Sequence, residues 1–495
     1  MDYNEDLNLR TCPPPSLKRL FTDFSSHNED EPVAINCDYY DTTSQIPNLS
    51  GPNHSMFHIN IASLGLHKDE LEAALSMLDV DFDIIAITET KIIKNVDPIY
   101  DVNLQGYQPP YQTPTESFKG GALIYVKEGI DVKRRTDLES KMYESGKLET
   151  VFLEIMNGKK KELFGCIYRH PSMDINSFNE KYFNDTVAKI TEEKKICYLA
   201  GDFNIDLLKS DTDNHTKDFF DTLSSNLFVP HITLPTRITN RSQTLIDNIF
   251  SNNPEFENCT SGNFTFSISD HLAQFLIVPS ADNKPPKAHN IKIRDTKNYS
   301  HEELVADIIN VDWTAVLDSE KGDPKHSFQR FNDKVNEILD KHMPWRKLSR
   351  KELRIQAKPW LTTGILNSIQ RRDKLLGKCI EAKDPTRKER LRTEYKALRN
   401  RITYIINESK KTHYQNFFAE HCNNIKKTWK GIKSIISIRS ITDSQPTSMM
   451  IDKCLKTNPE DIFKDLMHIS HLLLKSYYPN ILLAPSTSLN ICQIG

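Results

Sequence analysis

Short apolar runs recur between Met56 and Val278, and several are bounded by Gly, Asn or Asp. Runs of this length between turn residues predict β-strands. Between some of them apolar residues recur at intervals of three and four, which predicts helices, and Asp69 and Glu72 resemble the capping pair of the first. Strands mixed with helices predict an α/β domain over residues 51–280. The expected strands are Met56–Ile61, Ile84–Ile87, Ala122–Val126, Val151–Ile155, Leu163–Tyr168, Ile196–Leu199, Leu245–Phe250 and Ala273–Val278.

The segments on either side of this domain have different compositions. Residues 1–50 are rich in Asn, Asp and Ser and include three consecutive prolines, so we expect a flexible acidic tail. Residues 281–299 have the composition of a linker. We expect residues 300–440 to be helical and increasingly basic, and residues 441–495 to form a poorly ordered tail.

Charge is distributed unevenly along the 495 residues, although the net charge is only -3. Residues 1–340 hold 34 basic against 54 acidic residues, whereas residues 341–440 hold 26 against 8. A narrow apolar stripe runs through the basic part, with most of the basic residues lying off it. Such a helix fits a solvated face and a nucleic-acid-binding surface equally well. The stripe consists of Leu391, Tyr395, Leu398, Ile402 and Ile405.

Several classes of protein are excluded by the same sequence. No apolar run approaches the roughly 18–20 residues that span a bilayer, so we expect no membrane contact. The N-terminus lacks the pattern of a secretory signal. The nine cysteines show neither a Cys-x-x-Cys pair nor a zinc-site spacing, which favours reduced thiols and an intracellular protein. Neither Gly-rich phosphate-binding motif occurs.

Acidic and amide residues follow the ends of several expected strands. Each has an ordinary explanation alone: Gly-Asp-Phe-Asn at 201–204 could be a tight turn, and a single Asp could cap a helix. Several carboxylates buried in one domain cost free energy of folding unless a cation or hydrogen-bond donors contact them. Oxygen ligands suit Mg²⁺ or Mn²⁺ better than zinc. The residues are Asn60, Glu89, Asp202, Asn204, Asp247, Asp270 and His271.

The ordered motifs HINIASL, AITETK, GGALIYVK, GCIYRHP, LAGDFNID, LPTRIT, SQTLIDNIF and SDH resemble the endonuclease/exonuclease/phosphatase superfamily. The motifs are most similar to the endonuclease domain of jockey-type non-LTR retrotransposons. This resemblance implies a four-layer α/β sandwich and an intracellular protein that works in the nucleus. KPWLTTGI and the basic helices resemble the segment before the reverse transcriptase of such elements. No Tyr/Phe-x-Asp-Asp polymerase motif occurs, so we expect a truncated copy.

The resemblance also implies catalytic roles for five residues. Asp202 corresponds to the aspartate that orients or deprotonates the attacking water, and Asn204 to the amide that fixes this water and the phosphate. His271 corresponds to the histidine that hydrogen-bonds the scissile phosphate, and Asp247 to the carboxylate that holds its ring. Tyr168 corresponds to a tyrosine that contacts the phosphate.

A second group is implied to hold the metal. Glu89 corresponds to the metal-binding glutamate, Asn60 to the amide that supports the metal site, and Asp270 to the acidic residue beside the histidine. Some relatives place a carboxylate where this chain has Ala62, and others an Asn in the segment Tyr168–Pro171, which here reads Tyr-Arg-His-Pro. Local cations are expected to line the cleft, namely Lys91, Lys94, Arg169 and Arg237.

The sequence therefore predicts a Mg²⁺- or Mn²⁺-dependent DNA endonuclease that leaves a 3′-hydroxyl. The basic residues 341–440 are expected to attract DNA and offer a surface for the element's RNA. Two alternatives remain open. One is a phosphodiesterase or phosphatase of the same superfamily acting on RNA, inositol phosphates or lipids, and the other is a catalytically dead nucleic-acid-binding remnant.

Overall fold

The computed structural model divides the chain into two compact units, residues 1–283 with 358–495, and residues 284–357. Within the described ranges no helix is both long and apolar enough to cross a bilayer. The structure describes residues 37–41, 45–46, 53–78, 80–94, 102–116, 119–157, 160–239, 242–265, 268–279, 292–297, 299–317, 324–347, 358–422, 424–435, 449–451 and 454–456.

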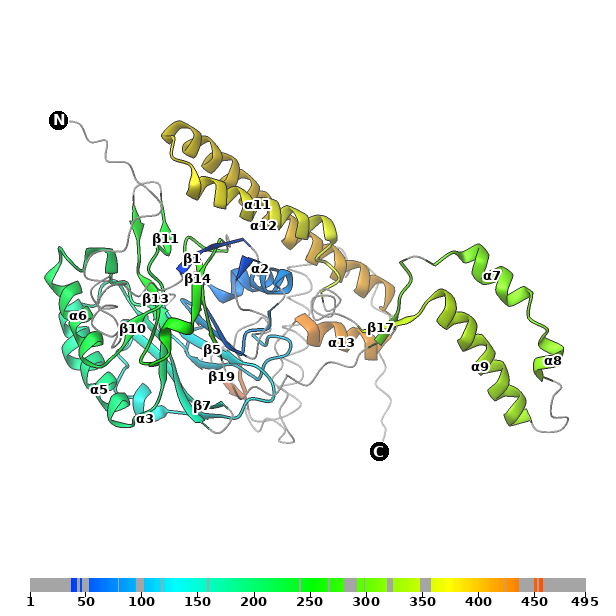
Figure 1. The fold of residues 1–495 in the computed structure, drawn as a ribbon, viewed down its shortest axis with the longest axis horizontal. Helices are drawn as coiled ribbons and strands as arrows, with labels where there is room; N and C mark the ends of the chain where they lie inside the picture. Colours follow the sequence, from blue (N-terminus) through cyan, green and yellow to red (C-terminus); the bar gives the residue numbers. More distant parts are fainter. Residues whose placement is uncertain are drawn as a thin grey trace. The chain divides into compact units, whose positions relative to one another are not determined.

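The first unit contains two mixed sheets that pack face to face (Figure 1). Strands correspond to all eight apolar runs expected from the sequence. The seven-stranded sheet runs in the order β1 (Cys37–Tyr40), β14 (Thr260–Phe264), β15 (Ala273–Pro279), β2 (Asn53–Asn60), β3 (Ile84–Thr88), β5 (Ala122–Val126) and β4 (Tyr111–Thr113). The six-stranded sheet runs in the order β10 (Val229–Pro230), β13 (Asp247–Ser251), β9 (Cys197–Asp202), β8 (Lys160–Arg169), β7 (Leu148–Asn157) and β6 (Val132–Arg134).

Helices cover the outer faces of both sheets. The helix α2 (Leu64–Met77) packs on the seven-stranded sheet. The six-stranded sheet is covered by α3 (Thr136–Glu139), α4 (Ile175–Phe178), α5 (Asn184–Glu192) and α6 (Asn214–Ser225), with a π-helical turn η2 (Asn179–Phe183) between α4 and α5.

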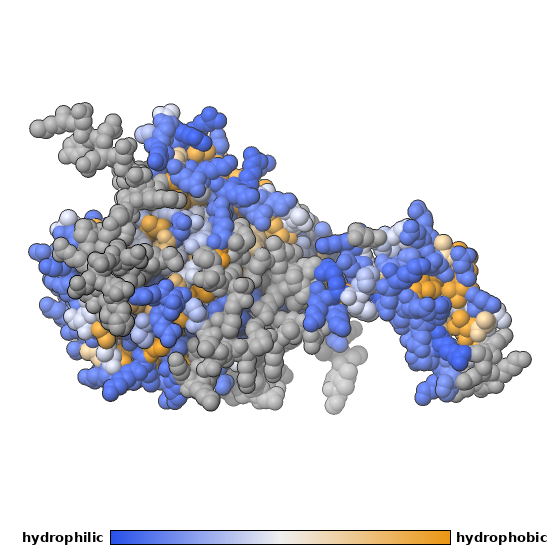
Figure 2. All heavy atoms as spheres, in the orientation of Figure 1, coloured by the Kyte–Doolittle hydropathy of each residue, from blue (hydrophilic) through white to orange (hydrophobic). Residues whose placement is uncertain are grey.

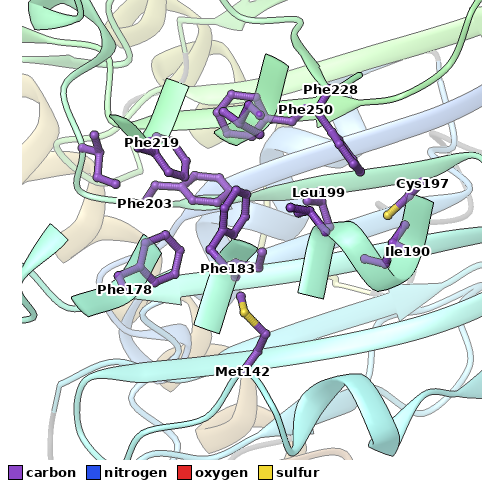
Figure 3. Close-up of a cluster of buried hydrophobic side chains, with 14 of the residues drawn as sticks. Met142, Phe178, Phe183, Ile190, Cys197, Leu199, Phe203, Phe219, Phe228 and Phe250 are labelled. Carbon is purple, nitrogen blue, oxygen red and sulfur yellow. The ribbon is translucent and has the colours of Figure 1, made fainter. Parts of the chain in front are cut away.

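Three apolar clusters separate these layers, which confirms the predicted four-layer α/β sandwich. Alternation along β3 shows how the layers arise, because Ile84 and Ala86 belong to the cluster between the sheets while Ile85 and Ile87 belong to the cluster beneath α2. The cluster beneath α4–α6 is rich in phenylalanine, and the rings of Phe183 and Phe219 lie 5.0 Å apart (Figure 3). Burial of these rings fixes the helices on the sheet that carries Asp202.

Two boundaries differ from the sequence prediction. The strand β1 pairs in parallel with β14, so residues 37–40, assigned above to the tail, extend the first sheet. The rest of the predicted tail at residues 1–36 lies outside the described residues. Of residues 441–495, the structure describes only the antiparallel pair β18 (Met449–Ile451) and β19 (Cys454–Lys456). The predicted helical segment is also divided, because the boundary between the two units falls at residue 357.

The basic part of the chain forms a pair of long helices on the sandwich domain (Figure 1). They are α11 (Thr363–Glu381) and α12 (Pro385–Glu420), followed by α13 (Ile425–Ile435). Asp384 caps α12, since its side chain accepts a 2.7 Å hydrogen bond from the amide of Arg387, and Pro385 occupies the first turn. Of the predicted stripe, Tyr395 and Ile402 are buried and Leu391 and Leu398 are partly buried, whereas Ile405 is exposed and Ile406 is buried instead.

Carboxylates on α2 bind these helices. Arg372 of α11 is buried and lies 3.0 Å from Glu70, and Thr403 of α12 donates a 2.8 Å hydrogen bond to the same carboxylate. Lys410 lies 2.7 Å from Asp69. The predicted capping role of Asp69 is therefore wrong, because α2 begins five residues earlier, after Ser63.

The second unit, residues 284–357, is small. Figure 2 shows apolar side chains among those over its helices. The exposed apolar residues of this unit include Ile309, 72% exposed, and Phe328, 68% exposed. Its described elements are β16 (Lys292–Arg294), α7 (His301–Ile309), α8 (Trp313–Leu317), α9 (Pro324–His342) and β17 (Trp345–Lys347).

Candidate active site

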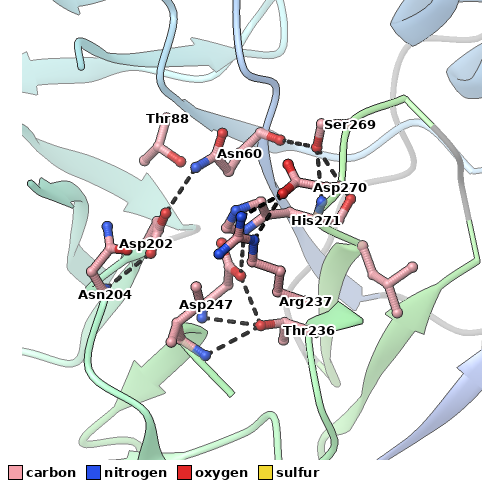
Figure 4. Close-up of polar contacts among 12 residues, drawn as sticks. Asn60, Thr88, Asp202, Asn204, Thr236, Arg237, Asp247, Ser269, Asp270 and His271 are labelled. Carbon is pink, nitrogen blue, oxygen red and sulfur yellow. Dashed lines mark hydrogen bonds and ion pairs between the residues drawn. The ribbon is translucent and has the colours of Figure 1, made fainter. Parts of the chain in front are cut away.

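The predicted polar residues converge where the two sheets meet at one edge (Figure 4). Asn60 is the last residue of β2 and Asp202 the last of β9, while Glu89 directly follows β3. The amide nitrogen Nδ2 of Asn60 donates to Oδ2 of Asp202 at 2.8 Å and to Oε1 of Glu89 at 3.1 Å. One buried amide thus joins carboxylates from both sheets.

The second half of the site is an ion pair between Asp247 and His271. Asp247 begins β13, which runs antiparallel to β9 and places it opposite Asp202. Nδ1 of His271 lies 2.8 Å from Oδ2 of Asp247, and both side chains are buried. Thr236 donates a 2.7 Å hydrogen bond to the same carboxylate oxygen. This arrangement fixes the plane of the ring.

The pKa values of Asp202 and His271 are both raised, which favours a neutral carboxyl group and a charged imidazole ring. Burial and the neighbouring Asp247 raise the pKa of Asp202 to about 7. Burial lowers the pKa of His271, but the carboxylates of Asp247, Asp202 and Asp270 outweigh it and raise the pKa to about 9. At neutral pH the site therefore contains an imidazolium and a carboxyl group that exchanges its proton readily.

Glu89 has a strained backbone conformation, and its carboxylate accepts hydrogen bonds from two side chains. Its φ of 51° lies in the left-handed region, which non-glycine residues rarely occupy and which is typical of functional sites. Oε1 accepts from Asn60 and, at 3.2 Å, from the hydroxyl of Tyr168. Oε2 lies 4.0 Å from Nζ of Lys91, and the side chain is 25% exposed. Burial and the Glu89 charge raise the pKa of Tyr168, so its hydroxyl keeps its proton.

The end of β9 and the loop after it are fixed by a close backbone contact and by hydrogen bonds between side chains and the main chain. Gly201 is required there, because a Cβ would meet the carbonyl oxygen of Ile167 at 1.9 Å. The amide of Asn204 donates to Oδ1 of Asp202 at 2.9 Å, and its side chain donates to the carbonyl of Arg169 at 2.8 Å.

Arg169 does not line the cleft as predicted. It is 2% exposed, and its guanidinium donates to the carbonyls of Phe203, Met173 and, at 2.8 Å, Asn204. An arginine that satisfies three carbonyls stabilises a loop conformation. Its function is therefore to hold the Asp202 loop.

Asp270 and Arg237 bind each other at the exposed rim. Their side chains form a 2.7 Å ion pair and are 47% and 42% exposed. Asp270 neighbours His271 in sequence, yet the carboxylate predicted as a metal ligand faces a guanidinium in the structure (Figure 4). Lys94 pairs similarly with Glu116 at 3.1 Å.

Three further residues of the site were not predicted from the sequence. Ser269 donates to the carbonyl of Asn60 at 2.6 Å and accepts from the amide of His271 at 3.1 Å. Thr236 orients Asp247, as described. Glu149 is buried on β7 opposite Tyr168, and burial raises its pKa to about 7. Its only sequence signal is an acidic residue between apolar positions of an expected strand.

Two groups of side chains could hold a cation. Asp202, Asp247 and His271 each offer a ligand atom, and these atoms lie within 4.8 Å of one another. A cation there competes with the proton that His271 shares with Asp247. Glu89 offers a partly exposed carboxylate oxygen beside the Asn60 amide, and oxygen donors of this type fit a hard divalent ion.

The fold and the site together fit the hydrolysis of phosphate esters. Residues 56–271 match the Endonuclease/Exonuclease/phosphatase family. The family resemblance of the motifs is thereby confirmed. Nucleases and phosphatases both belong to the family, so this match alone leaves the substrate open.

Three solved structures are similar to part of this chain at low identity. The endonuclease domain of TRAS1, a telomere-specific non-LTR retrotransposon, is 16% identical with a TM-score of 0.34, over 46% of this chain and 99% of that domain. The AP endonuclease LMAP from Leishmania major is 14% identical with a TM-score of 0.36, over 46% and 88%. The Xenopus laevis APE2 catalytic domain is 18% identical with a TM-score of 0.34, over 46% and 94%. No curated protein matches the chain.

Proposed function

We propose that the chain is a divalent-metal-dependent DNA endonuclease that hydrolyses one phosphodiester bond and leaves a 3′-hydroxyl, of the kind found in non-LTR retrotransposons. One observation carries the proposal: Asn60 joins Glu89 to Asp202, and His271, charged by Asp247, lies beside them. A general base, a cationic donor and an oxygen ligand thus surround one space. The substrate assignment rests on the jockey-type motifs and on the basic helices.

The residues divide the reaction between them. Asp202, with a pKa near 7, takes a proton from the attacking water, a role typically worth about 10²–10⁴-fold in rate. His271 donates from its charged ring to a phosphoryl oxygen, where negative charge grows in the transition state. The neutral hydroxyl of Tyr168 donates to the same phosphate, and Asn204 helps to position the water.

Glu89 and Asn60 would hold the divalent ion. When bound, such an ion neutralises charge on the phosphoryl oxygens. We also propose Asp270 as a ligand of this ion, for which its carboxylate would have to leave the ion pair with Arg237. Action on chromosomal DNA would place the protein in the nucleus.

The test is nicking of supercoiled plasmid by the full chain with Mg²⁺, with Mn²⁺ and with EDTA. We expect nicks only with metal, and extension of each nick by an added polymerase will show the 3′-hydroxyl. Nicking that persists in EDTA contradicts the metal assignment. Hydrolysis of inositol phosphates or phospholipids without nicking supports the phosphatase alternative, and DNA binding without any hydrolysis supports the remnant alternative. His271→Ala is the negative control for a contaminating nuclease.

A further inference from the structure

The positive charge of α12 is concentrated in the half that lies beside the active site. Residues 385–401 hold seven basic and two acidic residues, whereas residues 402–420 hold two of each. In Figure 2 the surface over α11 and α12 is mainly hydrophilic. An intramolecular role explains Arg372 and Lys410, which bind the carboxylates of α2. Binding to α2 does not explain the excess of basic residues in the first half of α12.

Two arginines attach this half of α12 to the segments that carry the active-site rim. A guanidinium nitrogen of Arg392 donates to the carbonyl of Ile238 at 3.2 Å, next to Arg237. A guanidinium nitrogen of Arg399 donates to the carbonyl of Ile268 at 3.1 Å, two residues before Asp270. Among the described residues neither arginine forms an ion pair with a carboxylate. Both charges therefore stand at the rim without an acidic partner.

Four cations lie on the same side of α12. Lys388, Arg392, Lys396 and Arg399 follow one another at intervals of four, four and three residues, which places them along one face. Lys396 is exposed and the other three are partly exposed. At about 1.5 Å per residue the row extends roughly 16 Å, which matches about five phosphates of one strand of duplex DNA. Through Ile238 it continues to Arg237, whose backbone pairs with that of His271.

We propose that Lys388, Arg392, Lys396 and Arg399 form a phosphate-binding row that holds the DNA backbone on one side of the scissile bond. The proposal rests on the proposed function, since it takes DNA as the substrate, and adds where the duplex lies. The row gives an acidic sandwich domain a cationic track that leads to His271. It binds backbone and not bases, because lysine and arginine at regular spacing neutralise phosphates without reading sequence.

The experiment measures binding of a short DNA duplex by the full chain in EDTA, where no cleavage is expected, over a range of salt concentrations. The test variant is Lys388→Ala/Lys396→Ala, which removes two charges of the row and neither arginine that contacts the sandwich domain. The matched control is Lys426→Ala/Lys430→Ala, which removes two exposed charges from α13. We expect the row variant to bind about tenfold more weakly at low salt, with a salt slope smaller by about two. The control should change the affinity less than twofold.

A hydroxyl-radical footprint on a duplex with one preformed nick shows on which side of the nick the row binds the DNA backbone. The row variant should lose protection on one side of the nick only. Equal weakening in the row and control variants, or symmetrical loss of protection, overturns the proposal. Loss of binding to single-stranded RNA with unchanged DNA binding overturns it in favour of an RNA surface. Plasmid nicking by the unmodified chain separates the two proposals, because the row can bind DNA even where no nicking occurs, and nicking can occur where the row has no effect.

Discussion

Asp247 has two neighbours on a single carboxylate oxygen, and this sets the charge of His271. Oδ2 accepts from Thr236 at 2.7 Å and lies 2.8 Å from the histidine ring, while Oδ1 has no hydrogen-bond partner among the described residues. The carboxylate is fully buried, so the charge of each group offsets the cost of burying the other. The two side chains therefore act as a unit.

The first prediction concerns this unit. Asp247→Asn keeps the shape but removes the charge, so the pKa of His271 should fall from about 9. Because the protonated ring is the active form, the alkaline limb of the nicking rate should move from near pH 9 toward neutral pH. The measurement is a pH–rate profile of plasmid nicking for both proteins.

The control is a double-mutant cycle of Asp247→Asn and His271→Ala. Groups acting as one unit are non-additive, so the double variant should be little slower than the worse single variant. Mg²⁺ titration should give nearly the same apparent affinity in all of them. Additive losses, or a large change in Mg²⁺ affinity for Asp247→Asn, would show that Asp247 binds the metal.

A second prediction at the residue scale separates Glu89 from that unit. Glu89→Gln keeps the acceptor for Asn60 and Tyr168 but removes the charge that attracts a divalent ion. Nicking should fall at low Mg²⁺ and recover in part when Mg²⁺ is raised. His271→Ala, which alters no proposed ligand, should show no such recovery. Equal rescue of both variants would argue against metal binding at Glu89.

Among the elements, α2 and α11 are joined by a buried ion pair whose removal should be costly. Arg372 is 1% exposed and Glu70 4% exposed at their side chains. Arg372→Ala leaves Glu70 buried without its charge partner, so we expect a loss of about 3 kcal/mol in the free energy of unfolding. Arg390→Ala breaks an exposed pair within α12 and should cost no more than about 0.5 kcal/mol. Denaturant unfolding of the full chain measures both.

The pH dependence of the Glu70 contribution has a definite sign. Burial raises the pKa of Glu70, but the neighbouring His67, the charge of Arg372 and a hydrogen bond from Thr403 outweigh it and hold the pKa below its usual value. A carboxylate with a depressed pKa stabilises the fold above its unfolded pKa of about 4.3 and loses that effect as pH falls. The stability difference between the unmodified chain and Glu70→Gln should therefore shrink on acidification. A constant difference between pH 7 and pH 3 would contradict this.

How far sequence predicts each element depends on whether its signal is local. The strands β3 and β5 are continuous apolar runs, and their expected bounds agree with the structure to within one residue because both faces are buried. The strand β2 begins three residues before its expected start and β9 ends three residues after its expected end, because buried polar residues extend both strands. The short strand β1 was missed, because its sequence CDYY alternates weakly and its pairing partner lies more than 200 residues away.

The candidate site residues could likewise be predicted where a short motif follows a strand. Asp202 and Asn204 follow a strand within one short motif, so their convergence with Asn60 follows from strand direction. Arg169 lies in an equally suggestive motif but turns inward, since the carbonyls of Phe203 and Asn204 after β9 and of Met173 after β8 take its donors. Sequence cannot distinguish a guanidinium that meets phosphate from one that meets backbone.

In the whole molecule, the docking of α11 and α12 changes what a shortened protein should do. From sequence alone, residues 51–282 are a self-contained domain that keeps its activity and loses only DNA affinity. In the structure such a fragment lacks β1 and uncovers the carboxylates of α2, which then lose Arg372 and Lys410. Both losses act on the same seven-stranded sheet.

We therefore expect residues 51–282 to unfold several degrees below the sandwich domain of the full chain, since each kcal/mol lost corresponds to about 2–4 °C for a domain of this size. A fragment of residues 37–282, which restores β1, should recover part of the difference and none of the DNA affinity. The salt slope of DNA binding should be equally small in both fragments, because neither contains the basic row on α12. Thermal unfolding and salt-dependent binding of the three proteins measure these effects separately. Unfolding of both fragments at the temperature of the full chain would show that α11 and α12 rest on α2 without stabilising it, and a full salt slope in either fragment would place the DNA contacts within the sandwich domain itself.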